Sequence, residues 1–445
     1  MSALNTDLYE LTMAAGYFVA QKTDEIATFE LSIRRLPQAR NFLVAAGLEQ
    51  AVEYLLNLRF LREEIAYLRG LPQFANTPPE FFTFLEKLRF TGDLFALPEG
   101  TPVFANEPLA IIRAPLIEAQ VIETFLLSTF MFQTMVASKA ARCVLASEGR
   151  PVVEFGSRRA HSPSAGIFAG RAAFIGGAAG TSNTESGMRF GIPVFGTAAH
   201  SWTMAFGDEE KSFRSLQQLL GESTVFLIDT YDTLEGARLA ARMGKPVWGV
   251  RLDSGDLISL SRQVRRILDD AGLHDAKIFA TNDLDEYRVA EFMRAGAPMD
   301  AFGIGTQLAT SADAPSLSAV YKLVELQRGK KLLYTAKFSD DKSTVPGAKQ
   351  IYRYPDHDVV ALYSECNDDF LGEPLLRPVI IKGERLESAP DLKGVQAHAC
   401  AAIRALPQRF HSLEPAEPYE VEISPRLLAM AEDLRQELQI ERQIG

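Results

Sequence analysis

Cysteine is scarce in this chain of 445 residues, and its scarcity argues against two kinds of scaffold. The three cysteines are Cys143, Cys366 and Cys400, and none belongs to a Cys-x-x-Cys pair. An odd, widely spaced set is not a disulfide framework, so a reducing compartment is the simplest interpretation. His398 and Cys400 alone supply too few ligands for a structural zinc site.

The chain also lacks a surplus of positive charge and a long uninterrupted apolar run. It has 46 Lys and Arg against 57 Asp and Glu, a net charge of −11, which argues against a general nucleic-acid binder. A pocket can still be locally positive and bind a small anion. The most apolar stretch, residues 121–137, contains Glu123 and Gln133, which favours a buried helix over a membrane span. Because no cationic segment opens the chain, we expect a cytoplasmic protein that binds neither nucleic acid nor membrane.

Between residues 150 and 310, short apolar runs alternate regularly with helical segments. Six such runs end in small or polar residues: 152–156, 194–197, 225–229, 247–253, 277–282 and 301–306. Alternation at this spacing predicts a parallel sheet with helical crossovers. The first interval is the widest and leaves room for a weak strand near residues 172–176. The length suits most of a (β/α)8 barrel, and a doubly wound open sheet is the alternative.

The segments before residue 150 and after residue 310 contain both strand-like and helix-like patterns. Residues 27–33 alternate as a strand does, residues 94–114 indicate a small β-unit, and Pro115 opens a long helix to about residue 146. Residues 331–338 and 359–363 indicate antiparallel strands, and residues 425–440 indicate a helix. We therefore expect an α/β fold with an irregular (β/α)8-type barrel and a second α+β domain. The barrel would span residues 121–330, and the second domain would combine residues 1–120 with residues 331–445.

Two arginines, Arg158 and Arg159, follow the first of the six runs. The guanidinium fork suits phosphate or carboxylate, although a single arginine could equally bridge two loops. The small-residue segment 176–183 could offer backbone N–H groups to an anion or could simply cap a helix. The Gly-rich loop 302–308 follows the last run, where barrels often hold phosphate. It matches neither the dinucleotide-binding Gly-x-Gly-x-x-Gly pattern nor a Walker A motif.

His200 lies just past the second run, in Gly196-Thr-Ala-Ala-His-Ser-Trp202. A histidine in general is more often structural than catalytic. The small residues before His200 permit close approach of a ligand, and a neutral imidazole can act as a nucleophile.

Carboxylates end the third and fourth runs, where Asp229 and Asp253 lie, the latter next to Arg251. Such carboxylates could bind ribose hydroxyls or Mg²⁺. The alternative role is helix N-capping by Asp253 or Ser254.

Taken in order, these segments resemble the nicotinate phosphoribosyltransferases. The motifs that carry the resemblance span residues 6–13, 154–160, 180–183, 196–202, 251–256 and 303–306. It implies ATP-coupled transfer of a phosphoribosyl group from phosphoribosyl pyrophosphate to nicotinate, in NAD biosynthesis by salvage. The products would be nicotinate mononucleotide and pyrophosphate, with Mg²⁺ as cofactor and ATP as co-substrate. The last hundred residues carry no motif of this kind.

The resemblance also implies roles for individual residues. His200 would be the phosphohistidine that couples ATP to the reaction, and Asp253 a second catalytic residue. Asp229 and Asp253 would be candidates for Mg²⁺ or ribose. Tyr9 would stack on the pyridine ring, often from a neighbouring subunit, so we expect a homodimer with sites at the subunit interface. The substrate-binding set would be Tyr9, Phe155, Arg158, Arg159, Ser182, Thr197, Asp229, Arg251, Gly303, Gly305 and Thr306.

Three other functions fit the sequence less well than this one. Nicotinamide phosphoribosyltransferases tend to carry Asp where this chain has Ser182, and a carboxylate there would repel nicotinate. Ala198 departs from the family pattern, in which many members carry a second histidine at that position. A non-catalytic ligand sensor would be expected to lose His200 or the arginines, and neither is lost. A Schiff-base aldolase needs a lysine at the end of a strand, whereas Lys277 begins its run.

Overall fold

A computed structural model of the chain describes residues 2–338, 344–365 and 370–444. Cys366 lies outside the described residues. The chain divides into two compact units, which are described separately. The first comprises Met1–Thr134, Ser316–Asp391 and Ala401–Gly445, and the second comprises Met135–Pro315 and Leu392–Cys400.

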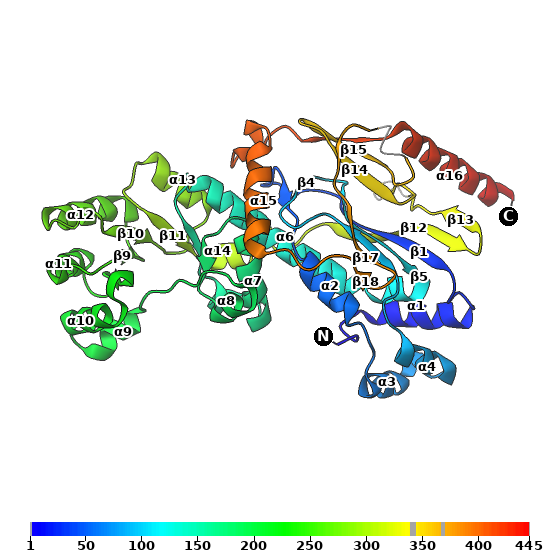
Figure 1. Cartoon of the computed structure of the whole chain (residues 1–445), viewed down its shortest axis with the longest axis horizontal. Helices are drawn as coiled ribbons and strands as arrows, with labels where there is room; N and C mark the ends of the chain where they lie inside the picture. Colours follow the sequence, from blue (N-terminus) through cyan, green and yellow to red (C-terminus); the bar gives the residue numbers. More distant parts are fainter. Residues whose placement is uncertain (1, 339–343, 366–369, 445) are drawn as a thin grey trace. The chain divides into compact units, whose positions relative to one another are not determined.

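The second unit is built on a parallel sheet, as the strand–helix alternation predicts. Its strands are β6 (Val152–Glu154), β7 (Gly180–Thr181), β8 (Val225–Leu227), β9 (Gly249–Leu252), β10 (Lys277–Ala280) and β11 (Ala301–Ile304). Figure 1 shows helices α11, α12 and α13 beside strands β9, β10 and β11. The helices are α7 (Pro163–Ile175), α8 (Thr184–Phe190), α9 (His200–Phe206), α10 (Glu209–Leu220), α11 (Thr233–Met243), α12 (Leu257–Asp270), α13 (Glu286–Arg294) and α14 (Thr306–Ala309).

The expected irregular (β/α)8-type barrel is not confirmed in the described residues, because the parallel sheet has six strands and two free edges and does not close. Its order, β7-β6-β11-β10-β9-β8, is the cyclic order of a βα barrel opened between β7 and β8. A barrel closes only when hydrogen bonds join every neighbouring pair of strands. The run at 194–197 is not a strand: Val194 forms one isolated bridge to Thr181 and is 46% exposed. Pro193 before it has no N–H to donate, and no described residue of this run pairs with β8.

Two local expectations in this unit are also wrong. Residues 172–176 lie in and just after α7, which begins at Pro163 behind the N-cap Ser162, and the strand of that interval is β7. Proline suits the first helical position, and an alanine-rich sequence then favours the helix. The helix caps are Asp232 for α11 and Asp256 for α12, not Asp253 or Ser254. Asp253 therefore does not serve as a helix cap.

The first unit combines mostly antiparallel strands with helices, and only the β15–β19 pair among its described strands is parallel. One sheet has the order β13-β12-β1-β5-β3-β17-β18, a second has β16-β14-β15-β19, and β2 pairs with β4. The strands are β1 (Ile26–Ile33), β2 (Leu43–Val44), β3 (Asp93–Ala96), β4 (Pro102–Val103), β5 (Pro108–Pro115), β12 (Ala319–Arg328), β13 (Lys331–Tyr334), β14 (Lys349–Arg353), β15 (His357–Leu362), β16 (Glu373–Pro374), β17 (Arg377–Ile381), β18 (Glu384–Arg385) and β19 (Glu420–Ile423). The remaining helices of the chain are α1 (Leu8–Val19), α2 (Leu48–Leu56), α3 (Arg62–Arg69), α4 (Pro79–Lys87), α5 (Leu116–Val121), α6 (Glu123–Ala146), α15 (Leu392–Ala405) and α16 (Pro425–Ile444).

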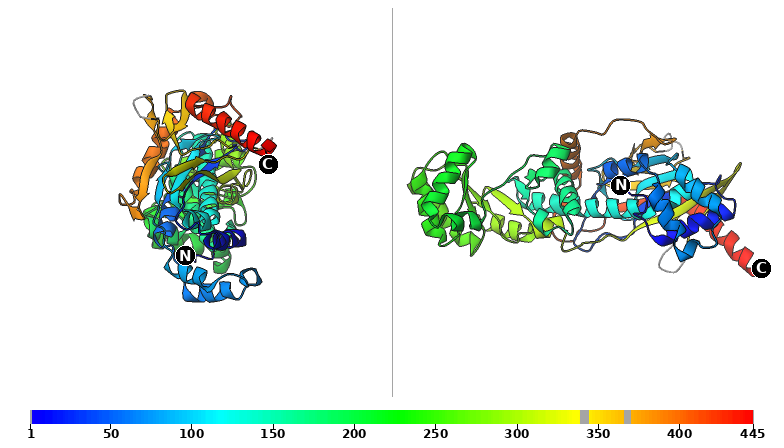
Figure 2. Two further views of the ribbon diagram at one scale, coloured as in Figure 1. Left: turned by 90° about the vertical axis from the view of Figure 1, so that its right-hand side faces the viewer. Right: turned by 90° about the horizontal axis from the view of Figure 1, so that it is seen from below.

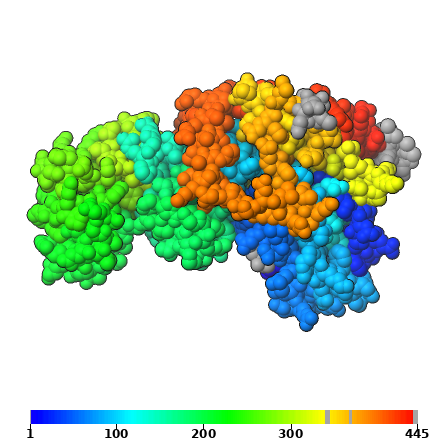
Figure 3. Space-filling model, viewed as in Figure 1, coloured from blue at the N-terminus to red at the C-terminus, as the bar shows by residue number. Residues whose placement is uncertain are grey.

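Segments from both ends of the chain share the first unit. β1 pairs antiparallel with β12 on one side and with β5 on the other, so residues 26–33 and 319–328 are neighbours in one sheet. In Figures 2 and 3 the blue and cyan segments lie among the yellow, orange and red ones in this unit. The ring of Phe104 stacks on that of Tyr419 at 3.8 Å, which joins the two ends again in the core.

The helix expected after Pro115 forms as two pieces, α5 and α6, separated by Ile122. The boundary between the two units falls within α6, between Thr134 and Met135. A search of the described helices finds none with the length and apolar character needed to cross a bilayer.

Candidate active site

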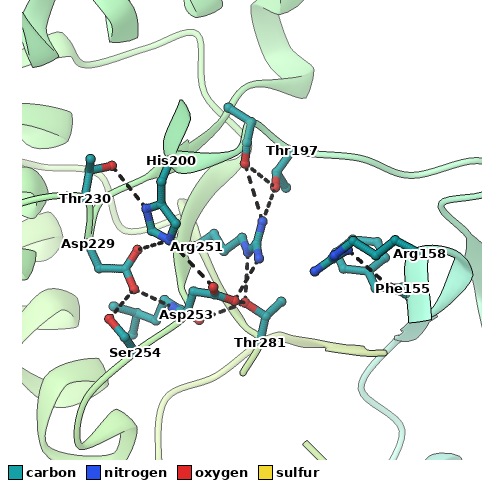
Figure 4. A network of polar contacts seen from close by, with 12 residues as sticks. Phe155, Arg158, Thr197, His200, Asp229, Thr230, Arg251, Asp253, Ser254 and Thr281 are labelled. Carbon is teal, nitrogen blue, oxygen red and sulfur yellow. Dashed lines mark hydrogen bonds and ion pairs between the residues drawn. The ribbon is translucent and has the colours of Figure 1, made fainter. Parts of the chain in front are cut away.

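Arg251 lies at the centre of a polar network at the carboxyl ends of the parallel strands (Figure 4). Its Nε donates to Thr281 Oγ1 at 2.8 Å, and its Nη1 donates to Thr197 Oγ1 at 2.8 Å. Its Nη2 donates to Asp253 Oδ1 at 2.7 Å, in an ion pair that is mostly buried. Contacts on three sides fix the guanidinium in one orientation, and Asp253 offsets its charge.

Asp253 is held in its ionised form by the same network. Burial acts to raise its pKa, but hydrogen bonds from Thr281 and Arg251, with the positive charge of Arg251, lower the pKa below its ordinary value. Asp253 Oδ2 lies 3.7 Å from His200 Nε2. A carboxylate thus faces the imidazole at neutral pH.

His200 is the first residue of α9, and its ring lies between two aspartates and a threonine (Figure 4). Nδ1 is 3.4 Å from Thr230 Oγ1, and Nε2 is 3.9 Å from Asp229 Oδ1. The side chain is 41% exposed, so the ring is accessible to a ligand.

Asp229 has one satisfied and one open carboxylate oxygen. Oδ2 accepts from the Asp253 backbone N–H at 2.9 Å and from Ser254 Oγ at 2.7 Å. Oδ1 is buried and accepts no hydrogen bond from any described residue. An unpaired buried oxygen beside His200 is a ready acceptor for an imidazole N–H or a ligand for a cation.

Phe155 is placed beside this network by the absence of a side chain at Gly303. A Cβ on Gly303 would lie 2.8 Å from the Phe155 ring and 2.8 Å from Thr281 Cγ2. The Phe155 ring also meets that of Phe279 edge-on, with centroids 5.4 Å apart. Gly303 therefore gives the ring its room, and Phe155 forms an apolar wall next to Thr281.

A cavity of about 470 Å³ lies next to Phe155, on the face of the sheet that carries Val153, Val225 and Phe279. Its lining is mostly apolar, but it reaches Thr197, the residue that accepts from Arg251. The apolar side chains of the lining are Pro151, Val153, Phe155, Ala179, Val194, Phe195, Val225, Trp248, Phe279 and Ala301. Pro151, Val225, Trp248 and Ala301 stand at the amino ends of their strands, so the cavity meets the polar network only at its other end, near Phe155 and Thr197.

The loops after β6, β7 and β11 pack closely beside the cavity. A Cβ on Gly156 would lie 2.7 Å from the Gly305 carbonyl oxygen, so the first and last of these loops are in contact. The buried Glu154 accepts from Thr181 Oγ1 at 2.6 Å, and its burial raises its pKa. Asn183 accepts from Ser186 N–H and caps α8. Of the two roles considered for the segment 176–183, helix capping is therefore the one observed.

The two arginines after β6 are both exposed. Arg158 Nη1 lies 3.4 Å from the Phe155 carbonyl oxygen, and Figure 4 shows its guanidinium directed toward the Arg251 side of the site. In the segment after β11, Thr306 begins α14 directly after Gly305. In the loop after β7, the Ser182 backbone N–H donates to the Glu154 carbonyl at 2.9 Å. The structure thus brings Phe155, Arg158, Thr197, His200, Asp229, Arg251, Asp253 and Gly303 to one site, with Ser182, Gly305 and Thr306 on the adjoining loops.

The carboxylates fit a hard divalent cation that takes most of its ligands from elsewhere. No cluster of three or more His, Cys, Asp or Glu side chains suited to a metal occurs among the described residues. Mg²⁺ is usually held by one or two carboxylates together with water and substrate phosphates. The open Asp229 Oδ1 and the ionised Asp253 match that pattern.

Sequence-family comparisons cover most of the chain. The nicotinate phosphoribosyltransferase (NAPRTase) N-terminal domain matches residues 4–130, the NAPRTase family proper matches residues 151–342, and the C-terminal domain matches residues 357–431. The chain belongs to the nicotinate phosphoribosyltransferase family. The C-terminal match falls in the hundred residues for which the sequence offered no motif.

Individual relatives agree with this membership. The chain is 44% identical to nicotinate phosphoribosyltransferase pncB2 of Mycobacterium tuberculosis, over 98% of this chain and 94% of the relative. It is 38% identical to the nicotinate phosphoribosyltransferase of Bacillus subtilis, over 95% and 93% of the two chains. The crystal structure of human nicotinic acid phosphoribosyltransferase matches with a TM-score of 0.80 and 27% identity, covering 96% of this chain and 99% of the human one.

Two site residues of this family member were not singled out by the sequence. Thr281 bonds both Arg251 and Asp253, and Thr230 faces His200. Ser254, considered only as a helix cap, bonds Asp229. Hydroxyl side chains near strand ends are too common to stand out without coordinates. Asn282 and Asp283 follow Thr281 with φ of 100° and 37°, a strained pair that often marks a functional loop.

Two residues of the predicted family set, Arg159 and Tyr9, have no bond to this network among the described contacts. Arg159 is exposed, and the structure gives it no role in the network. Tyr9 belongs to the first unit, on α1, and is 47% exposed. Partial burial, with the charges of Glu123 and Glu10, raises the pKa of Tyr9, so its phenol stays neutral.

Proposed function

We propose that this chain transfers the phosphoribosyl group of phosphoribosyl pyrophosphate to nicotinate in an ATP-coupled reaction, with nicotinate mononucleotide and pyrophosphate as products. The observation that carries the proposal is the fixed Arg251 beside an apolar cavity, with His200 facing two carboxylates. Membership of the nicotinate phosphoribosyltransferase family supports the same reaction. The product would feed NAD biosynthesis by salvage.

Nicotinate has a flat apolar ring and one carboxylate, and the site offers a partner for each. Phe155 would contact the ring at the end of the cavity that reaches Thr197. Arg251 and Thr197, which bond each other, would face the carboxylate. Tyr9 would stack on the ring from a second subunit, which aligns the weakly nucleophilic pyridine nitrogen.

Breaking the bond between C1 and pyrophosphate leaves positive charge on the sugar and negative charge on the leaving group. Asp253 and Asp229 would stabilise the sugar or bind its hydroxyls, and Arg158 and Arg159 would attract the leaving group. Mg²⁺ bound through Asp229 and Asp253 would supply further positive charge for pyrophosphate. The loop Gly303–Thr306 would hold the 5′-phosphate through its backbone N–H groups.

His200 would couple ATP to this reaction as a phosphohistidine. In the neutral ring, the carboxylates near Nε2 favour a proton on that nitrogen, which leaves the lone pair on Nδ1. Nδ1 would attack the γ-phosphorus of ATP, so that an N–P bond forms and ADP leaves. Water would later cleave the N–P bond and release phosphate.

Labelling with γ-labelled ATP tests the role of His200. We expect an acid-labile label on the wild-type protein and none on His200→Ala. His274→Ala is the matched control, because His274 is an exposed histidine of the same unit that lies 3.3 Å from Asp269. Equal labelling of wild type and His200→Ala would refute the assignment.

Substrate choice is tested by the rates with nicotinate and with nicotinamide. The chain carries Ser182, and not a carboxylate, at the position that distinguishes the two, so we expect nicotinate to be the faster substrate. A preference for nicotinamide would assign the chain to the amide-specific reaction.

Mixing two inactive variants tests the homodimer. If Tyr9 serves the site of a neighbouring subunit, Tyr9→Ala and His200→Ala are each inactive, but a mixed dimer contains one site with both native residues. We expect partial activity after the two variants are unfolded and refolded together. Full activity of a chain proven to be monomeric would contradict the shared site.

A further inference from the structure

A buried cluster of four charges lies in the second unit, apart from the network around Arg251. Lys139 on α6 forms ion pairs with Glu286 and, at 2.8 Å, with Asp313. Arg142, one helical turn further along α6, donates from Nε to Glu286 Oε1 at 2.9 Å. Lys139 is 1% exposed and Glu286 is fully buried, whereas Asp313 is 25% exposed.

The two carboxylates of this cluster belong to neighbouring loops at the carboxyl ends of the parallel strands. Glu286 is the first residue of α13 and follows β10 through the strained residues Asn282 and Asp283. Asp313 follows β11 through Gly305 and the short helix α14. β10 and β11 are adjacent in the sheet. Lys139 therefore ties the loop after β10 to the loop after β11.

The cluster pairs two cationic with two acidic side chains, and its two most buried members, Lys139 and Glu286, are held in their charged forms. Burial acts to lower the pKa of Lys139, but Glu286 and Asp313 outweigh it and the pKa is raised. Burial acts to raise the pKa of Glu286, but Lys139 and Arg142 outweigh it and the pKa is lowered. A buried charge that loses its partner is strongly unfavourable, so the two loops cannot separate from Lys139 without a large cost.

We propose that Lys139 is a positioning residue for phosphoribosyl pyrophosphate: it joins Glu286 and Asp313 so that the loops after β10 and β11 stand at the spacing the phosphoribosyl group needs. The inference rests on the proposed function, because that function places the 5′-phosphate on the loop Gly303–Thr306. The strained backbone at Asn282 and Asp283 persists only where the surroundings hold it, and Glu286 is the charged anchor that follows it, after the bonded Thr281 on the other side and the buried Leu284. Lys139 itself touches no substrate.

Steady-state kinetics of Lys139→Met measure the effect. The methionine keeps the length of the side chain but removes the charge that joins the loops. We expect the KM for phosphoribosyl pyrophosphate to rise at least about tenfold, because small displacements of binding groups weaken a site steeply. The KM for nicotinate should rise much less, since Thr281, which orients Arg251, directly follows β10 and keeps its own bonds to Arg251 and Asp253. Lys139→Arg should restore the KM for phosphoribosyl pyrophosphate.

A matched control separates positioning from general loss of stability. Arg353→Met removes a partly buried cation of the first unit that pairs with Asp358 at 2.6 Å, so it also leaves a buried carboxylate without its cation. We expect Arg353→Met to lower the melting temperature without raising the KM for phosphoribosyl pyrophosphate. If Lys139→Met does not fold, Asp313→Ala decides the matter, because it frees only the loop after β11 from a partly exposed position.

Calorimetric binding of phosphoribosyl pyrophosphate, measured without turnover, completes the test. Wild-type protein that neither binds this compound nor makes nicotinate mononucleotide would overturn the proposed function. Wild-type protein that does both, with an unchanged KM and binding constant in folded Lys139→Met or Asp313→Ala, would overturn only the inference about Lys139. Equal losses in every kinetic constant for Lys139→Met and Arg353→Met would also overturn it.

Discussion

Replacing Thr281 by valine removes one hydroxyl from the centre of the site and changes the shape of the side chain very little. That hydroxyl accepts from Arg251 Nε at 2.8 Å and donates to Asp253. Valine can do neither, so the guanidinium loses one of its three fixed contacts and the carboxylate loses a donor. The polar network around Arg251 thus becomes less rigid while the packing stays intact.

The size of the effect follows from these two hydrogen bonds. A net hydrogen bond to a charged group contributes about 1.5–3 kcal/mol. Arg251 is 12% exposed, so water cannot easily replace its lost acceptor, whereas Asp253 is 27% exposed and regains part of its loss from water. Counting one full bond, we expect kcat/KM for nicotinate to fall by about 10- to 150-fold, since each tenfold change corresponds to about 1.4 kcal/mol.

The pH profile supplies a second readout. Thr281 is one of the groups that lower the pKa of Asp253, so Thr281→Val raises that pKa. Activity that needs the ionised carboxylate is then lost at a higher pH as the solution is acidified, and the acid limb of kcat/KM shifts upward. Thr281→Ser, which keeps the hydroxyl, is the matched control. An unchanged kcat/KM and acid limb in Thr281→Val would refute the account of the network.

Three further predictions concern other positions. Gly303→Ala places a Cβ 2.8 Å from the Phe155 ring, so the free energy of unfolding in urea should fall by about 1–3 kcal/mol and the KM for nicotinate should rise; a variant unchanged in both would contradict the packing argument. Ser182→Asp puts a carboxylate on the loop after β7, so the ratio of kcat/KM for nicotinate to that for nicotinamide should fall, and an unchanged ratio would remove Ser182 from the selectivity of the site. Burial raises the pKa of Glu10 from 4.5 to about 8 in the folded chain, so its contribution to stability is complete below about pH 4.5 and is lost as the pH rises toward about 8; melting curves of Glu10→Gln should lack this decline, and curves parallel to wild type would disprove it.

The parallel sheet of the second unit was predictable because its signals are local. Apolar runs that end in Asp, Gly or Thr at regular intervals indicate buried strands whose polar ends share one edge. Five of the six runs are strands. The run at 194–197 has the same apolar start, but its pairing depends on an edge partner that lies elsewhere in the chain. The residues of the run alone could not show that it does not pair with β8, which stays an edge strand.

The candidate site shows the same division between local and distant information. Arg251, Asp253 and His200 stand in motifs a few residues long, so their residue types and spacing pointed to anion binding and to a reactive imidazole. Thr281 entered the site only because its strand pairs with that of Arg251. Lys139 gave no signal, because a lysine in a helix is ordinarily exposed and only the packing buries it.

The sequence by itself therefore determined the family, the alternation of strands and helices over most of the second unit, and the candidate residues for a site that binds anions. It did so because each of these depends on neighbours along the chain. Only the tertiary structure decided that the sheet is open between β7 and β8, and that His200 faces Asp229 and Asp253. It alone showed that one buried lysine joins two loops. Those features depend on which distant segments meet, and that is set by packing and charge pairing in the folded chain.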